Sequence, residues 1–183
     1  MARYTGNSDG DHGHARVGLI EFVKTVDEIT DHALWNNGTY ANRNMRGKST
    51  LSVHATGRAV DLSWRKFGRH GRSNGLAISR WFCKLLATNA ELMGIECILD
   101  YHPAPWGRGW RCDRGTWEKY SEKTIEGAPG GDWLHVELTP KMADSKSAVR
   151  EAFSDLAASG ALTTIPGTTR GAGRTHQVTE PSA

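Results

Sequence analysis

The sequence predicts one α+β domain in which helices pack on one side of a small antiparallel sheet. Three segments carry the apolar periodicity of amphipathic helices, and short strand-like runs lie between them. The chain has 183 residues, of which 38% are hydrophobic. This length and composition are sufficient for a single buried core.

The expected helices cover residues 17–34, 73–94 and 145–158. The second of them follows Ser73 and Asn74, which are favoured N-cap residues, and closes at Gly94. In the third, Val149 and Phe153 belong to the apolar stripe. The expected strands are two short ones around residues 57–64, followed by residues 95–101 and 133–138.

The remaining segments set the domain boundaries. Residues 1–14 are polar and aperiodic, which predicts a disordered tail, and residues 15–159 form the predicted domain. Residues 102–131 are rich in Gly, Pro and Trp and are expected to form a long loop with one short helix. Residues 160–183 are expected to be a flexible tail or linker.

Composition narrows the class of function. The net charge of +3 suits an anionic partner such as a wall polymer, but the scattered basic residues argue against nucleic-acid binding. No apolar run is long enough to span a bilayer, and we expect a monomer. The three cysteines form no C-x-x-C pair, which argues against a disulfide framework and a cysteine zinc site.

Two strand segments each present a polar residue on the face away from the core. Because side chains alternate along a strand, the apolar residues of AVDL and WLHVEL point inward, while Asp61 and His135 share the opposite face. His54 lies seven residues before Asp61. Two imidazoles and one carboxylate are a common catalytic zinc set that leaves one position open. The alternative is an ordinary solvated sheet face.

Two linked motifs carry a family resemblance. Ser52-x-His54-x-x-Gly57-x-Ala59-x-Asp61 is followed by Asp132-x-x-His135-x-Glu137. This pattern resembles the D-alanyl-D-alanine carboxypeptidases and phage L-alanyl-D-glutamate endopeptidases, a family that includes the vancomycin-resistance carboxypeptidases and is related to the Hedgehog N-terminal fold. The resemblance covers residues 38–138, and more loosely 17–156.

The resemblance implies a role for each matched residue. His54, Asp61 and His135 match the ligands of one Zn²⁺ ion, and Asp132 matches the catalytic acid/base. The alternative for Asp132 is a turn residue after two glycines. Glu137 is expected either to fix the tautomer of a ligand imidazole or to be a surface residue.

Further residues are candidate substrate contacts. Gly38-Thr39-Tyr40-x-x-Arg43 resembles a family stretch whose arginine reaches the substrate carbonyl or carboxylate. The resemblance therefore implies a catalytic role for Arg43 in holding the carbonyl oxygen, with Arg46 as the second candidate. The alternative is a solvated loop arginine. Ser52 is a further candidate from the motif. Trp106 and Trp110 are expected to stack on substrate, with core packing beneath the loop as the alternative, which is the preferred interpretation for Trp117. His32, His70 and His102 have no partner at suggestive spacing and are interpreted as structural or solvated.

The family implies a zinc metallopeptidase that hydrolyses peptidoglycan stem peptides. The polar N-terminus lacks the apolar segment of a signal peptide, so we expect synthesis in the bacterial cytoplasm and action on the wall after membrane opening. This favours a phage endolysin with L-alanyl-D-glutamate endopeptidase activity. The alternatives are a D-alanyl-D-alanine carboxypeptidase or dipeptidase, and a non-catalytic zinc-containing binding module of the same fold.

Overall fold

The computed structural model describes residues 3–45, 47–123 and 125–167. Within them it confirms an α+β domain with one six-stranded antiparallel sheet, in the strand order β1-β2-β6-β3-β4-β5. The strands are β1 (Trp35–Gly38), β2 (Ala59–Ser63), β3 (Ile95–Asp100), β4 (Arg108–Arg111), β5 (Trp117–Lys119) and β6 (Trp133–Leu138). The helices are α1 (Val17–Ile29), η1 (Val53–Thr56), α2 (Gly75–Thr88), α3 (Pro140–Ala143) and α4 (Lys146–Ala158).

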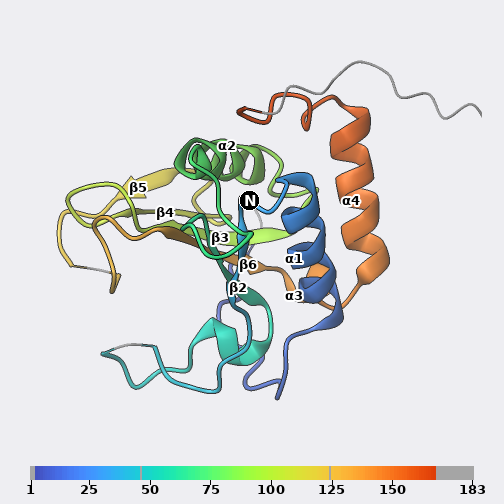
Figure 1. The fold of residues 1–183 in the computed structure, drawn as a ribbon. Coiled ribbons are helices and arrows are strands. Elements are labelled where there is room, and N and C mark those ends of the chain that lie inside the picture. Colours follow the sequence, from blue (N-terminus) through green and yellow to red (C-terminus); the bar gives the residue numbers. More distant parts are fainter. Residues whose placement is uncertain (1–2, 46, 124, 168–183) are drawn as a thin grey trace, which may run out of the picture.

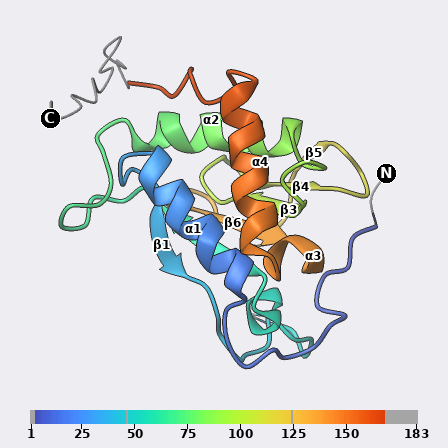
Figure 2. The same cartoon turned by 90° about the vertical axis from the view of Figure 1, so that its right-hand side faces the viewer.

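The core lies between the sheet and the long helices, which cover one of its faces (Figure 1, Figure 2). The alternation expected for β2 and β6 is confirmed, because Val60 and Leu134 are fully buried in the core cluster. Phe22 of α1 and Phe82 of α2 pack in the same cluster, with ring centroids 6.4 Å apart. The other face of the sheet is therefore the one that carries the polar side chains of the central strands.

The helices match the expected segments with shorter ends. The first ends at Ile29 because Asp31 and His32 adopt left-handed backbone angles, with φ of 50° and 62°, which a continuing helix excludes. The third expected helix is α4, which begins after Ser145, whose hydroxyl accepts a hydrogen bond from the Ala148 amide. Among the described residues, no helix has the length and apolar character needed to cross a bilayer.

The expected loop at residues 102–131 is corrected by the structure. The segment contains strands β4 and β5, and its described residues contain no helix. Trp110 pairs with Ile98 on one side and with Trp117 on the other. These cross-strand pairs bury apolar surface that a loop would expose, so the segment extends the sheet. The prediction that Trp117 packs in the core is confirmed in part, because it lies half-buried against the core cluster.

The N-terminal segment is a second correction. Residues 3–14, which were expected to be disordered, are ordered by long-range polar contacts. Thr5 donates a hydrogen bond from its hydroxyl to Glu96 at 2.8 Å, and Asp9 pairs with the buried Arg58 at 3.0 Å. At the other end, Leu162 is buried, so the domain extends past residue 159. Residues 168–183 of the expected tail lie outside the described part of the chain.

Candidate metal centre

The pairing of β2 with β6 sets the position of two candidate ligands. Asp61 lies directly opposite His135 in the antiparallel register, and both project from the face away from the core. His54 comes from η1, whose N-terminus is capped by Ser52: the Ser52 hydroxyl accepts a hydrogen bond from the His54 amide. The helix ends at Gly57, where φ is 72° and a Cβ would lie 2.3 Å from the His14 carbonyl oxygen. Only glycine fits this turn.

The three side chains converge with the spacing of a metal site. The ligand atoms of His54, Asp61 and His135 all lie within 4.8 Å of one another. His54 Nε2 is 3.4 Å and His135 Nδ1 is 3.1 Å from Asp61 Oδ1. Two ligands bound tetrahedrally to one zinc, each about 2.0–2.2 Å from it, stand about 3.3 Å apart. The donor set therefore fits a zinc ion in type and in spacing.

Further hydrogen bonds orient both imidazoles toward the candidate metal position. His54 Nδ1 donates to the Thr39 carbonyl oxygen, which leaves Nε2 free to bind a cation. His135 Nε2 donates to Glu137 Oε1 at 3.0 Å, and Nδ1 donates to Asp61 Oδ1 at 3.1 Å, so Nδ1 is the nitrogen that a cation would take in exchange for a proton. The Tyr4 hydroxyl in turn donates to Glu137 at 2.9 Å. Glu137 is only 4% exposed, so the surface-residue alternative for it is wrong, and it orients a candidate ligand.

The electrostatics of the metal-free site follow from this geometry. Burial lowers the pKa of His135, but hydrogen bonds from its ring to Asp61 and Glu137 outweigh burial and raise that pKa to about 10. Burial likewise opposes the charge on Asp61, and hydrogen bonds from His135 and His54 hold the pKa of Asp61 well below its usual value. Without a metal, His135 is therefore protonated at neutral pH.

Zinc binding is expected to release about one proton per ion at pH 7, because the metal takes the Nδ1 position that holds a proton. The zinc association constant should then rise about tenfold per pH unit between pH 6.5 and 8. The metal-free protein behaves oppositely: the raised pKa of His135 stabilises it fully below pH 6.5, and this stabilisation is lost as the pH rises through about 10. Calorimetry in buffers of different ionisation enthalpy measures the released proton, and a count near zero would contradict this account.

Glu137→Gln is expected to weaken zinc binding by about 10- to 100-fold, because the amide keeps the shape of the side chain but loses the charge that orients His135. Competition with a chromogenic chelator measures the affinity. Glu118→Gln on β5 is the matched control, since Glu118 is exposed and pairs with Arg114. Equal zinc affinities in Glu137→Gln and Glu118→Gln would show that Glu137 does not affect zinc binding.

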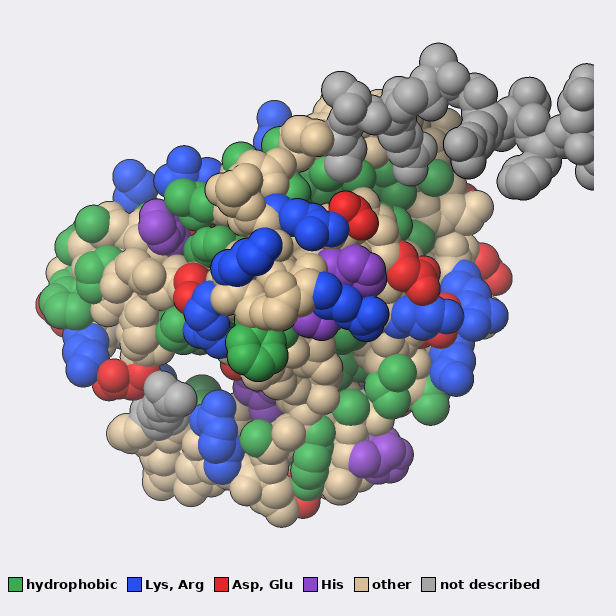
Figure 3. Space-filling model, in the orientation of Figure 1, with side chains coloured by type: hydrophobic (Ala, Val, Ile, Leu, Met, Phe, Trp, Pro, Cys, Tyr) green, Lys and Arg blue, Asp and Glu red, His purple; other side chains and the backbone are tan. Residues whose placement is uncertain are grey.

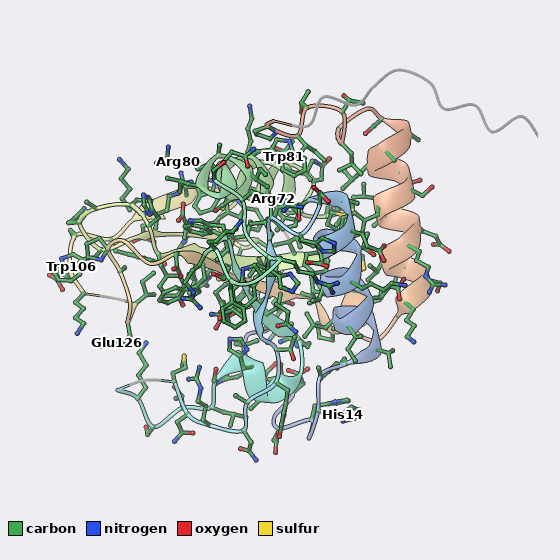
Figure 4. All side chains as sticks on the ribbon, in the orientation of Figure 1. His14, Arg72, Arg80, Trp81, Trp106 and Glu126 are labelled. Atoms are coloured by element: carbon green, nitrogen blue, oxygen red, sulfur yellow. The ribbon has the colours of Figure 1, made fainter. Side chains whose placement is uncertain are left out.

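A cleft of about 800 Å³ opens over these side chains. Its lining includes all three candidate ligands and Glu137. One wall comes from residues 37–41, 43, 45, 47 and 48, and the other from Lys123, Ile125 and Glu126. Figure 3 shows a hollow at the lower left, between the lobes that carry these two walls. Glu126 lies on the side of its loop that faces the opposite wall (Figure 4). A molecule bound in the cleft would therefore lie between two separate segments, directly over His54, Asp61 and His135.

Asp132 lies next to the site without lining the cleft. Its carboxylate forms an ion pair with Arg65, 3.2 Å from the guanidinium, and its side chain is 33% exposed. Arg65 itself lines the cleft and also donates a hydrogen bond to Asn37 at 3.3 Å. The Asp132 backbone carbonyl accepts a hydrogen bond from the Ser63 hydroxyl. Asp132 is therefore held just before the start of β6 and is paired with Arg65, which lines the cleft.

The other candidate contacts fall into different places. Arg43 is exposed and lines the cleft, and Ser52 lines it while capping η1. Trp110 is 5% exposed and belongs to the core cluster, so its expected substrate contact is wrong. Trp106 projects from the outer edge of the molecule, away from the cleft walls (Figure 4). Arg46 lies outside the described residues.

Several residues of the site were not expected from the sequence. Tyr4, Thr39 and Arg65 contact the site from segments far apart in the chain. For Arg65, the predicted pairing of the two strands could have indicated its position. The antiparallel pairing that joins Asp61 to His135 continues to the Trp64 amide and the Asp132 carbonyl, 3.1 Å apart, so the next residue had to lie near Asp132. No comparable local signal pointed to Tyr4.

Comparison of the chain with protein-family models, with curated proteins and with solved structures finds no match in any of the three. Three ligand-type side chains, two of them imidazoles oriented by hydrogen bonds, lie at the base of a cleft of about 800 Å³.

Proposed function

We propose that this chain is a zinc-dependent peptidase that cleaves the stem peptides of bacterial peptidoglycan. The observation that carries the proposal is the convergence of His54, Asp61 and His135 at the base of the cleft, at separations that suit one zinc ion. The two linked sequence motifs supply the reaction class by resemblance. A purely structural zinc site usually has four protein ligands and no adjoining cleft.

A zinc ion bound here would supply an activated water molecule and would polarise the scissile carbonyl group. The chain's own residues do the remaining work. Asp132 accepts the proton of the attacking water and delivers it to the leaving amine. The ion pair with Arg65 holds the Asp132 carboxylate just before the start of β6. Glu137 keeps His135 oriented throughout.

The charge of the cleft supports an anionic peptide as substrate. Five basic side chains line it, and stem peptides carry free carboxylates that lysine and arginine bind well. They are Arg43, Lys48, Arg65, Arg111 and Lys123. Arg43 and Lys48 form no ion pair with any carboxylate of the described residues, so they are the ones available to substrate.

Within the family we infer endopeptidase activity of the endolysin type. The cleft of about 800 Å³ has walls from two separate segments, and we propose that a peptide runs between them past the candidate metal. An endopeptidase needs this arrangement, because substrate continues in both directions from the scissile bond. The bond between L-alanine and D-glutamate is the one that the resemblance favours.

Digestion of purified stem peptides, with the fragments identified by mass spectrometry, tests the proposal. Release of L-alanine from the remaining peptide is expected with the zinc-loaded protein, and no release with His135→Ala. Loss of only the terminal D-alanine would show carboxypeptidase activity and would contradict the endopeptidase assignment. Binding of wall fragments without any cleavage would overturn the proposal in favour of a binding module.

A further inference from the structure

A second group of metal-ligating side chains lies away from the cleft. Asp27 is on the last turn of α1, His32 follows that helix, and His70 is on the loop before α2. Figure 2 shows the carboxyl end of α1 beside this loop, and the Gly71 amide donates a hydrogen bond to the His32 carbonyl at 2.9 Å. We infer that Asp27, His32 and His70 form a second binding site for a divalent transition-metal ion, which fastens the loop to the end of α1.

The geometry places one carboxylate between two imidazoles. The ligand atoms of the three residues lie within 4.8 Å of one another. His32 Nδ1 is 2.6 Å from Asp27 Oδ2, and His70 Nδ1 is 3.6 Å from Asp27 Oδ1. The side chains are 26–35% exposed, so a cation can enter from solvent and keep a water molecule as its fourth ligand.

Two of these atoms lack a hydrogen bond although they are buried. No described residue donates to Asp27 Oδ1 or bonds His70 Nδ1. Their separation of 3.6 Å is too long for a hydrogen bond and close to the distance of about 3.3 Å between two ligands on one tetrahedral zinc. A cation bound between them would satisfy both atoms and would replace the hydrogen bond from His32 by coordination.

The chain direction is reversed here to bring His32 back onto the helix. Asp31 and His32 have positive φ values, which are unfavourable for residues other than glycine, and the His32 amide donates to the Asp27 carbonyl at 2.8 Å. This turn aims the His32 imidazole at Asp27. A bound cation stabilises that conformation, because it binds the folded arrangement and not the unfolded chain.

The ligand set also selects the metal. Two imidazole nitrogens and one carboxylate suit Zn²⁺ and its transition-metal neighbours, whereas Ca²⁺ and Mg²⁺ prefer sites made of oxygen alone. The ion would fix a loop whose Phe67 stacks on Trp35 at 5.6 Å and whose Arg65 pairs with Asp132. Its effect on the cleft would therefore be to hold this loop in place.

Zinc stoichiometry after equilibrium dialysis, measured by elemental analysis of the full chain, tests the inference. Two ions are expected for the native protein, one for His70→Ala, and one for the double variant His54→Ala/His135→Ala. His12→Ala is the control for surface histidines, since the His12 and His14 rings lie 4.5 Å apart on the surface, and it should still bind two ions.

Asp27→Asn covers the case in which His70→Ala fails to fold, because the amide keeps the shape of the carboxylate, and it should also bind one ion. In the double variant, the retained zinc should raise the melting temperature, and Asp27→Asn added to that background should abolish the rise. A native protein with one ion, and a double variant with none, would overturn the second site while leaving the peptidase proposal intact.

Discussion

Asp132→Asn is expected to lower the rate of stem-peptide cleavage by about 10²- to 10⁴-fold, because an amide cannot accept the proton of the attacking water. Zinc content should be unchanged, since Asp132 is not among the three candidate ligands. The side chain keeps its shape and can still accept a hydrogen bond from Arg65, so the local structure should persist. Single-turnover cleavage of a purified stem peptide gives the rate.

Asp155→Asn is the matched control, because Asp155 is an exposed residue of α4, on the opposite side of the sheet from the cleft. It should cleave at the native rate. Cleavage by Asp132→Asn within a factor of two of the native rate would remove Asp132 from the chemistry. Loss of zinc in that variant would instead make it a residue that supports the metal site.

Arg58→Met is expected to be the most destabilising single substitution considered, at about 3–5 kcal/mol, because it leaves buried carboxylate charge without its partner. Arg58 is fully buried and pairs with Asp9 at 3.0 Å and with Glu96 at 3.3 Å. It also donates to the Gly6 and Leu138 carbonyl oxygens. The loss should lower the melting temperature by about 6–20 °C, because a domain of this size shifts by roughly 2–4 °C per kcal/mol.

Arg150→Met provides the contrast, since the exposed Arg150, 2.7 Å from Glu21 at the surface, is expected to contribute less than about 1 kcal/mol through this pair. Arg58→Met combined with Glu96→Gln should recover part of the stability, because the unpaired charge is then removed. Urea unfolding measures all of these free energies. Equal free-energy losses for Arg58→Met and Arg150→Met would show that the buried network contributes nothing particular.

The central strands and the candidate ligands could be predicted because their signals are local. Alternation over a few residues assigns Val60 and Leu134 to the core, and the same alternation assigns Asp61 and His135 to the other face. The motif spacing then added His54, which the structure brings within reach of both. The role of the three as zinc ligands stays a prediction.

What the sequence did not predict depends on contacts between distant segments. The sequence around Thr5 and Asp9 has the composition of a disordered tail. In the folded chain, contacts with Glu96 and Arg58 order this segment. Strand β4 could not be predicted from its Gly- and Trp-rich sequence, because pairing with β3, and not local β-propensity, makes this segment extended. His70 shows no useful spacing to Asp27, since a turn and a loop of the folded chain bring them together.

The central claim is that His54, Asp61 and His135 bind one zinc ion that serves peptide hydrolysis. Crystals grown with zinc, with data collected on both sides of the zinc absorption edge, test it most directly. An anomalous peak is expected about 2.0–2.2 Å from His54 Nε2, Asp61 Oδ1 and His135 Nδ1, with the fourth position facing the cleft. The absence of a peak between these three side chains, at full zinc occupancy elsewhere, would contradict it.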